Sequence, residues 1–390
     1  MSEWNEISIE EIATINPPES LPKGTLAKKV AMETLQPFTK KISSFSIEKY
    51  AGGAKFRNGD ILIARITPSL ENGKTAFVDI LDEDEIGFGS TEFIVLREKE
   101  NKSDKHFLYY LAISPNFREV AILSMTGSSG RQRVQTDVVK QHLFDLPPLT
   151  EQKAIASILS CLDKKIDLLQ RQNKTLEQMA ETLYEAWFEE SEFTSRIGDL
   201  IDLQNGYAFK SRSFQNFGED RVLKIKNISG GIVDIETTDF VSHETVKNLD
   251  EKFSISTGDI LFAMTGAKIG KMGIIPKTDY KLWLNQRVGL FKEKYYGSRF
   301  LAYLHLKSDY GKDYIENTAT GSAQPNISGT GIENCEFPEI SEQEIINYSN
   351  LLAPIYEKVI FNLGQIQKLE TIRNTLLPKL MSGEVTIANE

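Results

Sequence analysis

A duplication constrains this chain more than any other feature of its sequence. The tetrapeptide Gly-Asp-Ile-Leu occupies residues 59–62 and again residues 258–261, and each copy runs into an apolar stretch that is typical of a buried strand. Thr-Gly-Ser stands at residues 126–128 and again at residues 320–322. The period of roughly 190 residues is far longer than that of a solenoid repeat, so the sequence predicts a duplicated domain and not a repeat array.

A long amphipathic helix is predicted after each copy. Thr150 is a suitable N-cap for the first helix, whose apolar positions follow alternating steps of four and three residues from Ile155 to Trp187. Ser341 and Glu344 form a capping box at the start of the second helix, and its apolar seam repeats the first one. The predicted coiled-coil seam consists of Leu159, Leu162, Ile166, Leu169, Asn173, Leu176, Leu183, Leu352, Ile355, Val359, Asn362, Ile366, Leu369 and Leu376.

The two predicted helices have the same length, so an antiparallel pair within one chain is the simplest arrangement, with the two globular regions at opposite ends. Asn173 and Asn362 in the seam would fix the register at some cost in stability. Pro354 and Gly364 weaken the second helix. The alternative is that each helix packs on its own globular region and that its heptads form only an amphipathic face.

The expected fold class is α+β, with two pseudo-repeated mixed α/β domains joined by two long antiparallel coiled-coil helices. We expect a first domain at residues 1–149, a central helix at 150–190, a second domain at 191–340 and a C-terminal helix at 341–385. A chain of 390 residues suits two to three domains with separate cores. The acidic first residues lack a signal-peptide pattern and the two cysteines stand far apart, which predicts a cytoplasmic protein with reduced thiols.

The sequence contains no catalytic constellation. An Asn-Pro-Pro tripeptide at residues 16–18 resembles the start of an amino-methyltransferase motif, but Glu19 stands where an aromatic residue would stack on an extruded base. Residues 266–271 resemble a phosphate loop only faintly, because the spacing is one residue short and Met272 stands where a Ser or Thr would hold the metal. The four histidines have no neighbours that suggest a metal site or a triad. The chain is therefore predicted not to be an enzyme.

Polar, turn-rich segments stand at matched places in the two copies and differ in their side chains. Residues 89–92 align with 284–287, and residues 127–133 align with 321–326, which matches Gln132 with Gln324. Arg, Asn, Gln, Ser and Thr side chains read base edges and Lys contacts phosphate, although composition alone favours ordinary solvated loops. The candidate DNA-binding residues are Arg65, Thr67, Ser69, Asn72, Lys74, Ser90, Thr91, Ser128, Ser129, Arg131, Gln132 and Arg133 in the first copy, and Thr265, Lys268, Lys271, Asn285, Gln286, Arg287, Ser322, Gln324 and Asn326 in the second.

Three motifs together resemble those of the specificity subunits of type I restriction-modification enzymes. Pro-x-Leu-Thr-Glu-Gln-Lys opens the first helix at residues 147–153, and Pro-Glu-Ile-Ser-Glu-Gln-Glu opens the second at 338–344. Leu-Leu-Pro-Lys-Leu-Met-Ser-Gly-Glu-Val follows at 376–385. The resemblance covers the whole chain and implies two target-recognition domains, each followed by a conserved spacer helix. It implies that each domain reads one half of a bipartite double-stranded DNA site and that the helices set the gap.

The resemblance also implies partners. Similar complexes contain two modification subunits, which bind S-adenosylmethionine and methylate adenine, and restriction subunits, which are ATP-dependent translocases with a nuclease. S-adenosylmethionine, ATP and magnesium are therefore expected in the partner subunits, and no cofactor or metal is expected in this chain. The outer faces of the helices would contact the modification subunits.

The formal net charge of −10, most of it in the helices and the last residues, predicts weak, salt-sensitive DNA binding by the isolated chain and a large gain with partners. Two other classes of protein fit less well. A methyltransferase with fused specificity would need the cofactor and catalytic motifs that the sequence lacks. A coiled-coil adaptor without DNA contact would not explain two divergent loop sets on one framework.

Overall fold

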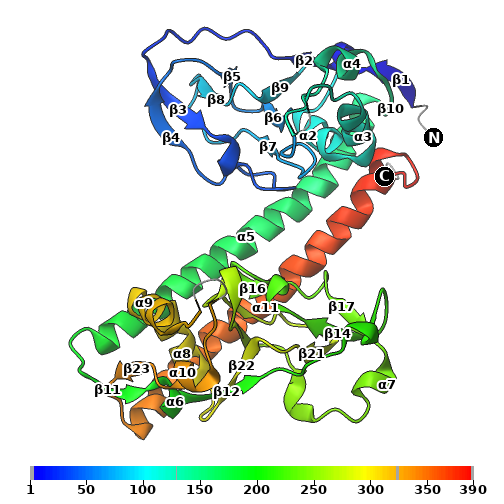
Figure 1. The fold of residues 1–390 in the computed structure, drawn as a ribbon. Helices are drawn as coiled ribbons and strands as arrows, with labels where there is room; N and C mark the ends of the chain where they lie inside the picture. The colour runs from blue at the N-terminus through cyan, green and yellow to red at the C-terminus, as the bar shows by residue number, and fades with distance from the viewer. Residues whose placement is uncertain (1–3, 129, 322–324, 388–390) are drawn as a thin grey trace. The chain divides into compact units, whose positions relative to one another are not determined.

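The computed structural model describes residues 4–128, 130–321 and 325–387 (Figure 1). The chain forms two compact units: unit 1 comprises residues 1–165 and 369–390, and unit 2 comprises residues 166–368. The long helices α5 (Leu149–Phe188) and α11 (Glu342–Met381) each contribute a segment to both units. No helix within the described ranges is long and apolar enough to cross a membrane.

Unit 1 contains two four-stranded sheets and a two-stranded ribbon. The sheets have the strand orders β2-β9-β6-β7 and β4-β3-β8-β5, and β1 pairs with β10. The strands are β1 (Asn5–Ser8), β2 (Ala13–Ile15), β3 (Leu26–Val30), β4 (Ser46–Lys49), β5 (Ala54–Phe56), β6 (Ile61–Ala64), β7 (Thr75–Phe77), β8 (Gly87–Gly89), β9 (Phe93–Glu98) and β10 (Leu143–Leu146). The shorter helices are α1 (Ile9–Ile12), η1 (Met32–Thr34), α2 (Lys105–Ile113), α3 (Pro115–Leu123) and α4 (Thr136–Gln141).

Unit 2 contains a six-stranded sheet, a five-stranded sheet and a ribbon. Their orders are β12-β22-β19-β20-β16-β15, β13-β17-β14-β21-β18 and β11-β23. The strands are β11 (Phe193–Arg196), β12 (Ile201–Asn205), β13 (Phe214–Gln215), β14 (Asp220–Leu223), β15 (Ile228–Ser229), β16 (Gly231–Val233), β17 (Asp239–Val241), β18 (Ser254–Ile255), β19 (Ile260–Ala263), β20 (Met272–Ile274), β21 (Lys281–Leu284), β22 (Val288–Glu293) and β23 (Glu336–Pro338). The shorter helices are α6 (Ile197–Leu200), η2 (Ser211–Ser213), η3 (Ile225–Asn227), α7 (His243–Val246), η4 (Glu251–Phe253), η5 (Gly266–Lys268), α8 (Ser298–Lys307), α9 (Asp309–Thr318) and α10 (Gly329–Glu333).

One sheet has the same plan in both units, because β2-β9-β6-β7 corresponds to β12-β22-β19-β20. The repeated Ile-Leu pairs begin the central strands β6 and β19, whose residues are all buried. Gly59 and Gly258 precede these strands with φ values of +93° and +83°, which glycine adopts without strain. The next residue in each copy, an aspartate, accepts a backbone hydrogen bond from Arg57 (2.7 Å) or Ser256 (2.8 Å). The repeated motif is therefore a turn that opens a core strand.

The segments of α5 and α11 pair in antiparallel fashion within each unit. In unit 1, Arg373 Nη1 donates to Asp163 Oδ1 at 2.8 Å. In unit 2, Trp187 near the end of α5 stacks on Tyr348 near the start of α11, with ring centroids 4.2 Å apart. The predicted antiparallel pair is confirmed, and every predicted seam residue is buried or half-buried.

The two seam asparagines meet in unit 2. Asn362 Nδ2 donates to Asn173 Oδ1 at 2.8 Å, and Asn173 Nδ2 donates to the carbonyl of Val359 at 3.4 Å. Because an unpaired buried amide is costly, this contact favours one register over its neighbours. The helices also pack on the globular cores, as Leu159 does in unit 1 and Leu352 does in unit 2, so the alternative interpretation describes a second role of the same helices.

Pro354 and Gly364, the two residues predicted to weaken α11, have different environments in the structure. The helix is continuous through Pro354, which is exposed. Gly364 is required by packing, since a Cβ atom there would lie 2.8 Å from the carbonyl oxygen of Lys277 in the same unit. The glycine therefore lowers the helix propensity of α11 but allows close approach of a neighbouring backbone.

Candidate nucleic-acid interface

Three of the predicted reading segments meet in unit 1. They follow β6, precede β9 and follow α3. The backbone N–H of Arg65 donates to the carbonyl of Glu92 (2.9 Å), and the N–H of Val134 donates to the carbonyl of Arg65 (2.9 Å). The N–H of Thr67 donates to the carbonyl of Gln132 (3.0 Å). The backbone therefore holds the three segments beside one another, although they lie far apart in sequence.

Unit 2 repeats this backbone framework. The N–H of Met264 donates to the carbonyl of Arg287 (3.0 Å), and the N–H of Ile327 donates to the carbonyl of Met264 (3.0 Å). The N–H of Gly266 donates to the carbonyl of Pro325 (2.9 Å). Each of these hydrogen bonds has a counterpart in unit 1, so the two loop sets can be aligned by their backbone contacts alone.

The hydrogen-bond framework corrects one detail of the sequence alignment. Gln132 in unit 1 and Pro325 in unit 2 accept equivalent hydrogen bonds, so the match of Gln132 with Gln324 is wrong by one residue. The reason is loop length. Thr126 and Arg133 close the first loop with paired backbone hydrogen bonds, and Thr320 and Asn326 close the second, which is one residue shorter.

Side chains at equivalent positions of the two frameworks differ in charge. Glu92 and Arg287 occupy the same place, as do Arg133 and Asn326. In unit 1, Arg133 donates to Glu92 from Nη2 (2.7 Å) and Nε (3.0 Å), and Arg65 Nε adds a contact of 3.2 Å. The hydrogen bond from Arg133 is the main cause that lowers the pKa of Glu92, with Arg65 contributing in the same direction. The carboxylate therefore stays ionised and orients two arginines.

Unit 2 presents a free arginine instead. Arg287 is exposed and adopts a left-handed backbone conformation with φ of +69°. Among the described residues, nothing pairs with its guanidinium. Met264 occupies the place of Arg65 and is buried, so no second arginine stands beside Arg287 at that position.

Several other candidate side chains support the loops. Lys74 Nζ donates to the carbonyl of Met32 (2.9 Å), and Lys268 Nζ donates to the carbonyls of Lys226 (3.0 Å) and Ile228 (3.1 Å). The hydroxyl oxygens of two other candidates accept backbone hydrogen bonds within the loops; they belong to Thr67 and Ser90. Thr265 is buried and Ser69 and Asn285 are half-buried.

The remaining described candidates are exposed, or half-buried in the case of Gln132. The exposed ones are Asn72, Thr91, Ser128, Arg131, Lys271, Gln286 and Asn326. Ser129, Ser322 and Gln324 lie outside the described residues. The structure thus brings the three loop segments of each copy together through backbone hydrogen bonds, while the contacts of their side chains with DNA stay a prediction.

Residues outside the set of candidate DNA-binding residues also lie near the loops of unit 1. A groove of about 430 Å³ is lined by the candidates Arg65 and Thr91 together with Lys55 and residues 16–19. Asn16 has a φ of +49°, and its Oδ1 accepts a hydrogen bond from the N–H of Val95 at 3.0 Å, so the asparagine that opens the tripeptide has a structural role. Only the fold places Lys55 beside these loops, and no local motif signals it.

The comparisons with known proteins agree with this architecture. The family model described as "Type I restriction modification DNA specificity domain" matches residues 1–178 and 189–370.

In the described part of the chain, no group of three or more His, Cys, Asp or Glu side chains is arranged to hold a metal ion.

Curated relatives carry the same description. The chain is 28% identical over 326 residues to the type I restriction enzyme MjaVIII specificity subunit of Methanocaldococcus jannaschii, covering 78% of this chain and 75% of that relative. It is 24% identical over 423 residues to the HindI specificity subunit of Haemophilus influenzae, covering 87% and 90%. A solved S subunit from M. genitalium shares the fold with a TM-score of 0.59 at 15% identity, covering 100% and 97% of the two chains. The chain therefore belongs to the type I restriction-modification DNA specificity family, and it is a specificity subunit without catalytic activity of its own.

Proposed function

We propose that each unit reads one half of a bipartite DNA site through its three clustered loops. The observation that carries this proposal is the shared backbone framework with Glu92 at one position in unit 1 and Arg287 at the same position in unit 2. Two readers with one framework and different side chains are suited to two different sequences, because base edges are distinguished by hydrogen-bond donors and acceptors. Arginine in particular reads guanine with two hydrogen bonds.

We further propose that α5 and α11 set the gap between the half-sites and hold two modification subunits on their outer faces. Exposed apolar side chains on both helices support a docking role, since a helix face that remains in contact with solvent normally carries polar side chains. These side chains belong to Leu168, Met179, Leu351, Phe361 and Ile372. S-adenosylmethionine would bind in the modification subunits, and ATP with magnesium would bind in the restriction subunits.

The net charge bears on how such a complex would hold DNA. With −10 at pH 7, this chain would repel the duplex over much of its surface, so basic partner subunits would supply most of the phosphate contacts. We expect weak, salt-sensitive binding by the chain alone and much tighter binding with modification subunits in a cytoplasmic complex. Titration of a labelled duplex with and without those subunits measures this difference, and equal affinities would contradict it.

Sequencing of methylated sites in cells that carry variant chains tests the division of labour. Arg287→Ala should relax or abolish recognition in one half-site, at a cost of about 1–3 kcal/mol per lost base contact, and leave the other half-site unchanged. Arg131→Ala should affect the opposite half-site. A methylated motif that stays the same in both variants, or that changes in both halves at once, would refute the proposal.

A further inference from the structure

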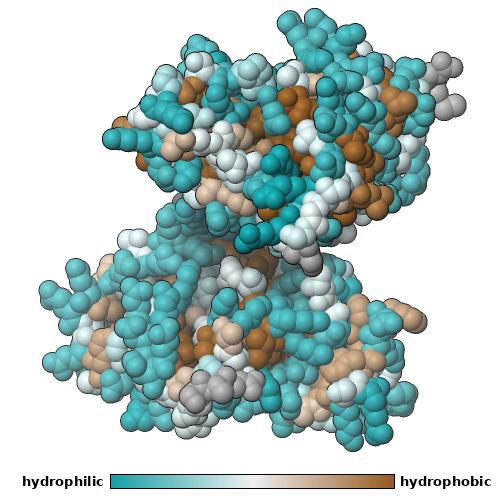
Figure 2. All heavy atoms as spheres, turned by 45° about the horizontal axis from the view of Figure 1, so that its top comes forward, coloured by the Kyte–Doolittle hydropathy of each residue, from teal (hydrophilic) through white to brown (hydrophobic). Residues whose placement is uncertain are grey.

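Hydrophobic residues reach the surface of both units in several places (Figure 2). Exposed apolar groups are ordinary in soluble proteins, so exposure alone does not identify a binding residue. Tyr207 of unit 2 is 38% exposed, and its backbone is in addition hydrogen-bonded to one of the reading segments. This tyrosine is not among the candidate DNA-binding residues predicted from the sequence.

A tight turn holds Tyr207 against the segment that carries Arg287. The N–H of Tyr207 donates to the carbonyl of Leu284 (2.9 Å), and the N–H of Gln286 donates to the carbonyl of Tyr207 (2.8 Å). A Cβ atom at Gly206 would collide with a backbone carbonyl oxygen of that segment, so only glycine allows this close approach. The turn is therefore a fourth segment of the reading framework in unit 2.

Two neighbouring rings fix the orientation of the Tyr207 side chain. Phe209 and Phe253 meet it in edge-to-face arrangements, with ring centroids 5.0 Å and 5.5 Å away. Among the described residues, nothing forms a hydrogen bond with the Tyr207 hydroxyl. A rigid aromatic side chain with a free hydroxyl can bind a ligand with little loss of conformational entropy.

The duplication identifies the residue of unit 1 that corresponds to Tyr207. Ile15 and Leu203 occupy equivalent places, because each pairs with the fourth residue of its neighbouring strand, β9 or β22. Glu19 and Tyr207 each follow four residues later in the chain. Glu19 is therefore the counterpart of Tyr207.

Glu19 is engaged within unit 1. Its side chain is 6% exposed and accepts hydrogen bonds from Arg57 Nε (2.8 Å) and Arg97 Nη1 (2.6 Å). Ser256 and Lys292 stand in the places of these arginines in unit 2, three residues before the aspartate of the Gly-Asp turn and fifth in β22. Unit 1 thus turns this side chain into its own structure, whereas unit 2 leaves the equivalent one accessible.

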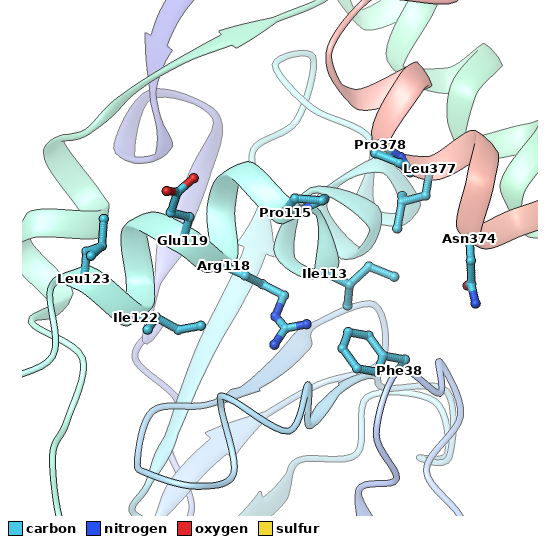
Figure 3. A pocket seen from close by; sticks show the side chains of 10 residues that line it. All are labelled: Phe38, Ile113, Pro115, Arg118, Glu119, Ile122, Leu123, Asn374, Leu377 and Pro378. Carbon is cyan, nitrogen blue, oxygen red and sulfur yellow. The ribbon is translucent and has the colours of Figure 1, made fainter. Parts of the chain in front are cut away.

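Two pockets of unit 1 have different linings. The larger one, of about 640 Å³, lies between α3 and α11 and is lined by none of the candidate DNA-binding residues (Figure 3). Its residue Ile113 belongs to the core of unit 1, and Ile122 packs against that core. The groove of about 430 Å³ is instead lined by Glu19 together with the candidates Arg65 and Thr91. The smaller pocket is therefore the one of the two that borders on the reading loops.

Aromatic rings occupy the corresponding place in unit 2. Ala54 lines the groove of unit 1, and Phe253 is its counterpart, because each stands six residues before the aspartate of the Gly-Asp turn. The Phe253 ring packs against Tyr207, so two large side chains replace two residues that line the groove. The two units therefore present different surfaces beside equivalent reading loops.

Basic residues follow Tyr207 along the chain. Lys210 and Arg212 are exposed, and among the described residues nothing pairs with their charged groups. Residues 204–212 include no Asp or Glu, although the whole chain has a formal net charge of −10. This stretch is therefore suited to the negatively charged backbone of DNA.

We propose that Tyr207 is a further specificity-determining residue of unit 2, whose hydroxyl hydrogen-bonds a base edge in the half-site that Arg287 reads. Lys210 and Arg212 contact the adjoining phosphates. A hydroxyl can donate or accept, so it suits either kind of group on a base edge. Neighbouring strands lie about 4.8 Å apart and base pairs about 3.4 Å apart, which places this contact one or two base pairs from that of Arg287. The inference rests on the proposed function, in which Arg287 reads DNA.

Tyr207→Phe tests the hydroxyl, because it keeps the ring contacts and should fold and assemble like wild type. In cells, the methylated motif should become degenerate at one position of the half-site that Arg287→Ala alters, and the other half-site should stay unchanged. In competition binding with the complex of this chain and modification subunits, discrimination at that position should fall about fivefold. Tyr280→Phe is the matched control, because Tyr280 of the same unit is 40% exposed but donates its hydroxyl to Glu236, and it should change neither result.

Lys210→Ala tests the phosphate contact. It should weaken binding of the complex to cognate and unrelated duplexes alike, and it should lower the slope of log affinity against log salt by about 0.9. The methylated motif should stay as it is in wild type. An unchanged slope would contradict this part of the inference.

The outcomes separate this inference from the proposed function. If Arg287→Ala changes the motif and Tyr207→Phe does not, the inference is wrong and the proposed function stands. If neither variant changes the motif, the proposed function is wrong for unit 2 and the inference falls with it. An equal loss of affinity for all duplexes in Tyr207→Phe would make the hydroxyl a phosphate contact, and weaker binding of modification subunits would make it a protein contact. Either of these results would overturn the inference.

Discussion

Replacing Glu92 with glutamine changes the charge of one reading surface and leaves the other as it is. Glu92 holds Arg133 through contacts of 2.7 and 3.0 Å and Arg65 through a contact of 3.2 Å. Glutamine keeps one acceptor oxygen but removes the charge that fixes both guanidinium groups. We expect the two arginines to become free for other partners, including phosphates, so that unit 1 loses sequence discrimination and gains nonspecific affinity.

The size of each effect follows from the geometry. The Arg133 and Glu92 side chains are 44% and 20% exposed, so solvent screens the ion pair, its contribution to folding is small, and the variant should fold normally. One additional arginine–phosphate contact steepens the dependence of log affinity on log salt by about 0.9 and tightens nonspecific binding roughly tenfold near 0.1 M salt. Loss of an oriented base contact costs about 1–3 kcal/mol of discrimination.

Fluorescence anisotropy of labelled duplexes with the complex of this chain and modification subunits, measured at several salt concentrations, gives the slope. Sequencing of methylated sites gives the half-site specificity. Glu48→Gln is the matched control, because Glu48 pairs with Lys29 at 2.9 Å in the same unit and outside the loops. An unchanged slope together with an unchanged first half-site would show that Glu92 does not control the two arginines.

Three further predictions concern the long helices and the core of unit 2. Gly364→Ala should lower the free energy of unfolding by about 1–3 kcal/mol in denaturant titrations, because its Cβ would meet the Lys277 carbonyl at 2.8 Å, whereas helix propensity alone predicts a gain of about 1 kcal/mol. Burial lowers the pKa of His305 to about 4, so the stability that the neutral ring contributes is present above about pH 6.5 and is lost as pH falls toward 4. In His305→Gln, the acid-induced loss in the free energy of unfolding, measured by urea titration at several pH values, should be smaller than in wild type by up to about 3 kcal/mol. Parallel pH profiles of the two proteins would contradict this prediction. Inserting one heptad into both α5 and α11 keeps the seam in phase and adds ~10.5 Å of helix, so the gap in the methylated site should grow by about three base pairs, and a constant gap would exclude the helices as its determinant.

The sequence was sufficient for features that depend on local pattern. The heptads of both helices and the Gly-Asp turn before each core strand rest on side chains within a few turns or residues of one another, and the duplication is visible because the same short motifs occur in both halves of the sequence. The alternative of two independent amphipathic helices could be weighed but not decided, because a helix that packs on a core and a helix that pairs with another helix show the same periodicity.

Other features depend on contacts between distant residues. Glu92 is not among the candidate residues predicted from the sequence, because its partners Arg65 and Arg133 come from two other segments. Gly364 had no visible purpose until the Lys277 backbone was placed against it. The match of Gln132 with Pro325 requires the backbone hydrogen bonds, because the loops differ in length. The contacts of each candidate residue with DNA stay predictions for the same reason.

The nesting of unit 2 within the sequence of unit 1 has a consequence for synthesis on the ribosome. Leu377, Leu380 and Met381 belong to the core of unit 1, yet they are made after all of residues 166–368. Domains generally fold as they emerge, beginning at the N-terminus. Here the unit whose synthesis begins first would be the last to close, and until then its apolar face would be open to chaperones or to aggregation.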